Sequence, residues 1–188
     1  LDKINENLDG GYSSAAERTI ERALGNYACD ENQRALLKQK LSYALETTGK
    51  YNESLEAIRE YENEAAVSVL KPQNAVQCLV QLAIAYNNIS NQPKAVALLD
   101  KAVKIAGSDP GSRHLLGNIY VAYARVYRKL NEFSLARTQA EKALGYFREY
   151  GSWRGMAETY REIASAYHQS GNSEKSIENY NLGIKIIG

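Results

Sequence analysis

The feature that most constrains the fold is a pattern of side-chain types that returns about every 40 residues. Its marker is a pair of small residues twelve positions apart. The four pairs are Ser42 and Ser54, Ala83 and Ala95, Ala124 and Ala136, and Ala164 and Ser176. Their first members lie 41, 41 and 40 residues apart. A chain that repeats at this interval is expected to fold as an array of stacked units.

Around each pair, bulky residues lie three and four positions apart. One run is Leu79, Leu82, Ala83 and Tyr86, and the next is Tyr120, Tyr123, Ala124 and Tyr127. This spacing places the side chains on one face of a helix. Small residues on both helices of a unit let the two axes approach closely where they cross. The pattern therefore predicts two antiparallel amphipathic helices per unit and an all-α chain, with no candidate strand.

Capping residues, glycines and prolines mark the helix ends. Asp30 and Gln33 have the spacing of a capping box, and Ser152 is placed to cap the helix that follows it. Asp109 followed by Pro110 is typical of an N-cap with proline at the first helical position. We expect helices at about residues 12–27, 31–48, 51–70, 73–89, 93–106, 110–130, 132–150, 153–170 and 173–187, with boundaries good to about three residues.

Composition excludes several classes of protein. The 188 residues include 23 Lys and Arg against 22 Asp and Glu, and this balance is unlike the basic excess of a generic nucleic-acid binder. The hydrophobic content of 44% argues against disorder. Cys29 and Cys78 lack metal or disulfide spacing and are expected to be small buried residues in a reducing compartment. Without a signal peptide or a membrane-spanning run, the sequence predicts a cytoplasmic protein.

The order of bulky, bulky, small and Tyr, then a turn, then Ala, bulky and Ala, resembles the tetratricopeptide repeat over about residues 10–188. The first position, often Trp in that family, is Lys38, Leu79, Tyr120 or Tyr160 here. The period exceeds the usual length of about 34 residues. Repeats this long are similar to those of bacterial peptide-sensing regulators and kinesin light chains.

This resemblance implies a right-handed superhelix of antiparallel helix pairs, an α-solenoid whose first helices line the concave side. We expect a single repeat domain over residues 1–188, with a partial unit at about 1–30 and units at about 31–71, 72–109, 110–151 and 152–188. Because the chain opens at Leu1 and its one methionine is Met156, we expect it to be a fragment of a longer protein.

The resemblance also implies a non-enzymatic scaffold that binds a protein or peptide in its groove. An alternative is a regulatory sensor arm of a larger signalling or transcription-regulatory protein that binds a peptide or small ligand. An enzyme is disfavoured, since no acid, base and nucleophile set is found. His114 and His168 lack a second metal ligand, so neither a metal nor a cofactor is expected. The repeated tyrosines are expected to be packing residues rather than a nucleic-acid platform.

Carrying over the register of the family gives the residues that face the concave side. They are Gln39, Tyr43, Glu46, Gln77, Val80, Ile84, Asn87, Asn88, Asn118, Val121, Arg125, Arg128, Lys129, Arg161, Ser165 and His168. Asn amides can pair with a peptide backbone, and Arg can grip a carboxylate with two bonds. We expect an extended partner with acidic groups near Arg125, Arg128 and Arg161 and an apolar anchor near Val80 and Ile84.

A second interpretation of these arginines, as ordinary solvated helix charges, stays open. Under either interpretation they are exposed, and exposed charges contribute little to folding. Charge reversal at Arg125 and Arg128 is therefore expected to weaken partner binding and to leave stability nearly unchanged.

Two features suggest contacts between copies of the chain. Residues 1–70 hold 8 basic and 13 acidic groups, whereas residues 113–161 hold 9 basic and 4 acidic, which could favour head-to-tail contact or steer a charged partner. Random scatter of surface charge is the competing explanation. The last helix carries Ile184 and Ile187 on one face with no later helix to cover them. We expect the native protein to continue past Gly188, or this face to self-associate.

Overall fold

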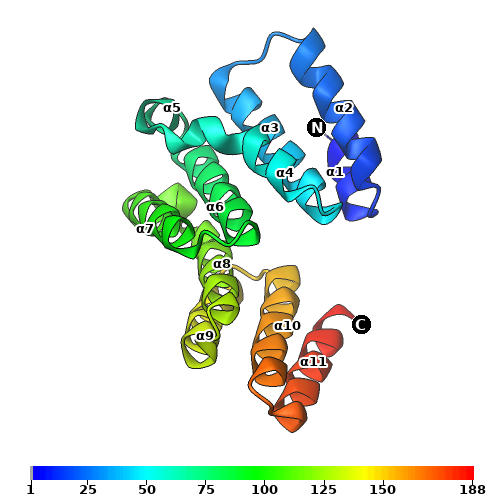
Figure 1. The fold of residues 1–188 in the computed structure, drawn as a ribbon, viewed down its shortest axis with the longest axis vertical. Helices are drawn as coiled ribbons and strands as arrows, with labels where there is room; N and C mark the ends of the chain where they lie inside the picture. The colour runs from blue at the N-terminus through cyan, green and yellow to red at the C-terminus, as the bar shows by residue number, and fades with distance from the viewer. Residues whose placement is uncertain (1) are drawn as a thin grey trace. The chain divides into compact units, whose positions relative to one another are not determined.

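The computed structural model describes residues 2–188, and every regular element in that range is a helix (Figure 1). The all-α expectation is confirmed. The chain forms two compact units, one ending at Leu98 and the other beginning at Leu99. The boundary lies inside one helix, α7 (Gln92–Ser108), whose first turns belong to the first unit.

The first unit includes a short first helix that the sequence pattern did not predict, and a short fifth helix that lies within the single helix predicted over residues 51–70. The elements of this unit are α1 (Asp2–Asp9), α2 (Ser13–Asn26), α3 (Glu31–Thr47), α4 (Tyr51–Ile58), the 3-10 helix η1 (Arg59–Glu62), α5 (Glu64–Ser68) and α6 (Pro72–Asn88). Helix α3 packs against α2, α4 and α6. Helix α1 packs on α2, where Ile4 joins Ala16 and Ile20 in a buried cluster.

The second unit continues from α7 with a 3-10 turn and four longer helices. These elements are η2 (Pro110–Leu115), α8 (Leu116–Lys129), α9 (Phe133–Glu149), α10 (Trp153–Gln169) and α11 (Ser173–Ile187). From α8 onward, consecutive helices reverse direction at each turn and pack against the next in line (Figure 1). Helix α10 also lies against α8, so the first helices of these two repeats are neighbours.

The small residues that define the repeat lie at the helix crossings. Ala83, Ala95, Ala124, Ala136, Ala164 and Ser176 are all buried. In the first repeat the crossing is polar, because the Ser42 and Ser54 hydroxyl oxygens lie 2.9 Å apart and the Ser54 hydroxyl donates to the Ser42 carbonyl at 2.8 Å. In this repeat the predicted close approach of the paired helices is confirmed.

A second kind of close contact surrounds the ring of Phe147, which is buried. A Cβ atom added at Gly155 would lie 2.5 Å from that ring, and one added at Gly117 would lie 2.6 Å from it. Both glycines are helical, and neither sits in a turn. They are needed because the ring fills the space that their side chains would occupy.

Most predicted helix ends are correct. The amide of Gln33 donates to the Asp30 carboxylate at 2.8 Å, which completes the capping box, and Ser152 accepts from the Gly155 amide at 3.3 Å. Gly49, Asn131 and Gly171 take the left-handed backbone conformation expected of turn residues. Ser90 takes it too, with φ of 65°.

Two predicted helices need correction. The helix expected at 51–70 is broken after Ile58, because η1 turns Tyr61 into the core and Asn63 adopts an extended backbone that caps α5 at Ala65. The helix expected at 110–130 begins as the 3-10 turn η2. Asp109 precedes it, but its carboxylate accepts from the Ser112 hydroxyl and caps no backbone amide.

Candidate functional site

In the first unit, the candidate residues lie on the neighbouring helices α3 and α6. Gln39, Gln77, Val80 and Ile84 are partly exposed, and 42% of Tyr43 is exposed. Near the end of α6, Asn88 is half-buried and Asn87 is buried. Val80 and Ile84 lie four residues apart on one helix face, and this is where the sequence placed an apolar anchor.

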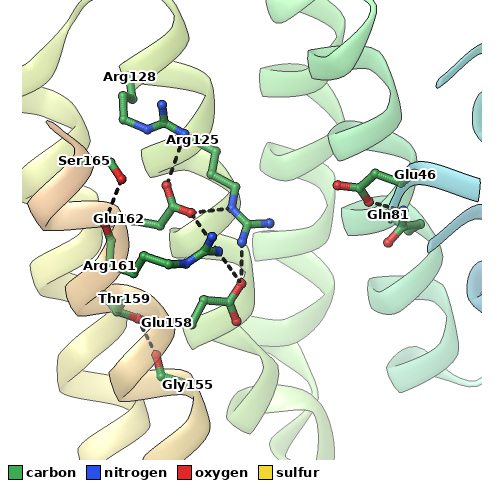
Figure 2. A network of polar contacts seen from close by, with 10 residues as sticks. All are labelled: Glu46, Gln81, Arg125, Arg128, Gly155, Glu158, Thr159, Arg161, Glu162 and Ser165. Atoms are coloured by element: carbon green, nitrogen blue, oxygen red, sulfur yellow. Dashed lines mark hydrogen bonds and ion pairs between the residues drawn. The ribbon is translucent and has the colours of Figure 1, made fainter. Parts of the chain in front are cut away.

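Gln81, which the sequence pattern did not identify, links the two helices of this face. Gln81 is buried, and its amide nitrogen donates to the Glu46 carboxylate at 3.0 Å (Figure 2). The bond joins α6 to α3 and engages Glu46, which the sequence had placed at the ligand face. The sequence does contain one sign of this residue's role, because Gln81 is a glutamine between Val80 and Leu82 in an otherwise apolar run.

In the second unit, the predicted arginines converge on carboxylates of α10 (Figure 2). Arg125 of α8 donates from Nε to Glu162 at 3.0 Å and from Nη2 to Glu158. Arg128 of α8 approaches the other oxygen of Glu162 at 3.3 Å. Arg161 pairs with Glu162 at 3.4 Å and lies 3.9 Å from Glu158. We refer to these five residues as the arginine cluster.

Burial within the arginine cluster is uneven. Only 5% of the Glu162 side chain and 22% of the Arg125 side chain are exposed. This largely buried ion pair therefore links α8 to α10. The Arg161 side chain is 59% exposed. The Nε atom of Arg128 is buried without a hydrogen-bond partner among the described residues. With three arginines and two glutamates, the cluster keeps one excess positive charge.

These contacts correct the expectation that the arginines are dispensable for folding. Reversing the charges of Arg125 and Arg128 would place acidic groups beside the buried Glu162 carboxylate, which is costly. Such a variant would lose stability as well as binding. The sequence could not reveal this, because Glu158 and Glu162 belong to the following repeat and lie more than thirty residues away along the chain.

The remaining candidate residues of this unit have different environments. Asn118, Lys129 and His168 are exposed, and the Ser165 hydroxyl donates to the Arg161 carbonyl at 2.9 Å. Val121 is 5% exposed and packs with Ala143 and Phe147 in a core cluster. We therefore leave Val121 out of the proposed binding surface.

The tyrosines of the second unit pack against one another. Tyr120 stacks on Tyr146 with ring centres 5.7 Å apart, and Tyr123 stacks on Tyr127 at 6.2 Å. Tyr123 is buried, and its hydroxyl donates to Asp100. Burial, followed by this hydrogen bond, raises the pKa of Tyr123. The tyrosines are therefore packing residues with hydroxyls that reach polar partners, as expected.

The cysteines and histidines show no catalytic arrangement. Cys78 is buried, and burial raises the pKa of its thiol to about 12, which leaves it unreactive at neutral pH. Cys29 is half-exposed. His114 is exposed and meets the edge of Tyr150 at 6.3 Å. Over residues 2–188, no group of His, Cys, Asp and Glu side chains is arranged to hold a metal ion. None of the helices in that range is both long and apolar enough to span a lipid bilayer.

Comparison with known proteins supports the repeat architecture. A family model described as tetratricopeptide repeat matches residues 157–187, which cover most of α10 and α11. No curated protein sequence matches the chain. The matched family is a repeat, and no enzyme family is indicated.

Solved structures share the fold of nearly the whole chain. PlcR from Bacillus thuringiensis, in its apo form, matches with a TM-score of 0.77 at 10% identity, covering 99% of this chain and 71% of PlcR. A Rap protein complexed with competence and sporulation factor gives 0.74 at 17% identity over 98% of this chain, which spans 52% of Rap. A kinesin light chain from Podospora anserina with nearly identical TPR-like repeats gives 0.59 at 17% identity, covering 98% and 92% of the two chains.

The chain is thus a helical-repeat protein with the fold of an α-solenoid. The tetratricopeptide-repeat family model matches its last helix pair, and solved structures with TPR-like repeats share the fold of nearly the whole chain. Proteins of this fold commonly bind other proteins or peptides.

Proposed function

We propose that the chain is a non-enzymatic scaffold that binds an acidic segment of a protein partner on the α8–α10 face. The observation that carries the proposal is the excess positive charge of the arginine cluster, whose most exposed member, Arg161, is 59% exposed. Support for ligand binding by this fold comes from the Rap protein, which was solved in complex with competence and sporulation factor.

The roles of the three arginines differ in this proposal. Arg125 is a positioning residue, because its donors already hold Glu158 and Glu162. Arg128 and Arg161 take the partner's carboxylate, since 26% of the Arg128 side chain and 59% of the Arg161 side chain are exposed to an incoming group. A charge-assisted hydrogen bond of this kind contributes about 1.5–3 kcal/mol. Lys129 is exposed at the end of α8 and adds to the cationic character, and His168 is exposed at the end of α10.

The α3–α6 face of the first unit is a second proposed contact surface with different chemistry. Gln39 and Gln77 offer amides to a peptide backbone, and Val80 and Ile84 offer an apolar anchor. We propose that this face binds an uncharged, partly apolar stretch of a partner.

The test is selection of binders from a random peptide library on the immobilised chain. We expect selected peptides to be enriched in Asp and Glu, and their affinity to fall about ten-fold or more in the double variant Arg128→Gln and Arg161→Gln, which loses one bond of this strength. The matched control removes two positive charges elsewhere in the unit, with Lys104→Gln and Arg113→Gln, and should bind like the parent. Equal loss in both variants would indicate a general charge effect, and no enrichment in acidic residues would contradict the proposal.

A further inference from the structure

Helix α11 presents an apolar face that nothing in residues 2–188 covers. Ile177 is 62% exposed, and Ile184 and Ile187 are each 65% exposed. The opposite side of the helix packs on α10 and buries Ser176 and Gly183. Helix α11 is therefore held on one side only.

The repeat register shows what such a face does elsewhere in this chain. Ser176 corresponds to Ala136, so Ile184 and Ile187 correspond to Leu144 and Phe147 of α9, each forty residues earlier. Leu144 and Phe147 are 5% and 4% exposed. They are covered by α10, where Leu144 packs with Ile163 and Phe147 meets Gly155. The positions that are exposed on α11 are thus covered on α9 by the following helix, α10.

We propose that the exposed face of α11 docks one further amphipathic helix, which packs on Ile184 and Ile187 as α10 packs on Leu144 and Phe147. This surface is separate from the peptide-binding faces proposed above. The occupant is a helix of the α10 type, with a small residue opposite Ile187 and a bulky apolar residue eight positions later, as in Gly155 and Ile163.

The small residue can be alanine in this case. Phe147 needs glycine at both Gly117 and Gly155, because its ring leaves no room for a Cβ atom. The position that corresponds to Gly117 in the last repeat is Ala157, and the smaller Ile187 replaces Phe147 there. In the last repeat, Ala157 of α10 therefore takes the place of a glycine next to Ile187. The docking helix can likewise carry alanine where it contacts Ile187.

A head-to-tail copy of the chain fits this face poorly. The exposed residues along α1 and α2 are polar or glycine, and include Lys3, Glu6, Arg18, Glu21 and Arg22. Exposed aromatic residues, Tyr12 and Tyr27, lie only at the two ends of α2. The N-terminal helix pair therefore offers no continuous apolar stripe to cover Ile184 and Ile187.

The test extends the chain after Gly188 with a second copy of residues 149–170 that carries Gly155→Ala, which keeps the forty-residue register because Gly188 corresponds to Arg148. We expect the extended protein to melt about 4 °C or more above the parent, because the added helix buries the two isoleucines. The same extension on an Ile184→Glu background should give no rise. The Ile184→Glu chain without the extension should melt close to the parent, since the side chain is largely exposed.

The matched control is Asn181→Glu. Position 181 corresponds to Glu141 of α9, which stays exposed although α10 is docked there. The extended Asn181→Glu protein should therefore keep the rise in melting temperature. The proposal is overturned if the extension adds no stability, or if the rise survives Ile184→Glu. It is also overturned if sedimentation shows that the unextended chain dimerises and that Ile184→Glu alone abolishes the dimer, because the occupant would then be a second copy.

Discussion

The carboxylate of Glu162 controls the charge of the α8–α10 face. It accepts from Arg125 at 3.0 Å and lies within 3.4 Å of both Arg128 and Arg161, while its own side chain is almost fully buried. A buried charge is tolerated only when it is paired. Without Glu162, three guanidinium groups would face one another across the two helices. The residue therefore serves folding first, and the arginine cluster keeps one net positive charge, which is the charge that we propose a partner binds.

This geometry predicts unequal effects for the two glutamates of the cluster. Glu162→Gln should destabilise the fold by about 1–3 kcal/mol, because it removes a buried partner from three arginines. Glu158→Gln should cost less than about 1 kcal/mol, since its side chain is 43% exposed and its pairs are screened by water. Urea unfolding followed by circular dichroism measures both. A larger cost for Glu158→Gln would contradict the assignment of Glu162 as the central residue.

A second prediction concerns the ring of Phe147. Alanine normally stabilises a helix relative to glycine by about 1 kcal/mol. Gly155→Ala should nevertheless destabilise this protein by about 1–2 kcal/mol, because the new Cβ atom would lie 2.5 Å from the buried ring. In a Phe147→Leu background the same change should become neutral or stabilising. A gain in stability for Gly155→Ala alone would show that the ring moves aside at little cost.

Sequence reasoning at the residue scale placed the arginines correctly on first helices but not their partners. The register that gives Arg125 and Arg128 follows from the spacing of neighbouring apolar residues, which is local information. Their pairing with Glu158 and Glu162 depends on how closely α8 and α10 approach. A single sequence does not contain that distance, so solvated charges and an internal ion-pair cluster looked alike.

At the scale of elements, the helix ends that depend on local sequence were predictable, and those that depend on packing were not. The starts at Asp30 and Ser152 were predictable, because capping depends on groups three residues apart. The break after Ile58 was not, because it follows from the burial of Tyr61 against the rest of the unit. Helix α1 was missed although Ile4 and Leu8 have helical spacing, since one turn of apolar residues is too short a signal.

The crossing of α3 and α4 allows a prediction about paired residues. Ser42 and Ser54 are fully buried and bond to each other, whereas the next two repeats carry alanine at both positions. Replacing one serine leaves the other hydroxyl without this partner, but replacing both reproduces a pair that the fold already uses. The double variant to alanine should therefore cost less than the sum of the two single variants by about 1 kcal/mol. Additive costs in a double-mutant cycle of unfolding free energies would show that the hydroxyls act independently.

At the scale of the molecule, each helix pair depends on its neighbours, because one amphipathic pair cannot cover its own apolar face. The repeat pattern made the stacked helix pairs predictable from sequence, and PlcR shares this fold. The same principle makes stability uneven along the chain. Helix α6 buries ten of its residues, from Ala75 to Asn87, whereas α11 buries two.

This contrast predicts the order in which the helices open. Hydrogen exchange of backbone amides reports local opening, which is easiest where few side chains are buried. The amides of α11 should exchange at least about ten-fold faster than those of α6, because opening α11 exposes little apolar area that is not already in water. The measurement is hydrogen exchange under native conditions, resolved by proteolytic fragments. Equal protection of α6 and α11 would mean that the chain opens only as a whole, and nearest-neighbour stabilisation would then be the wrong description of this molecule.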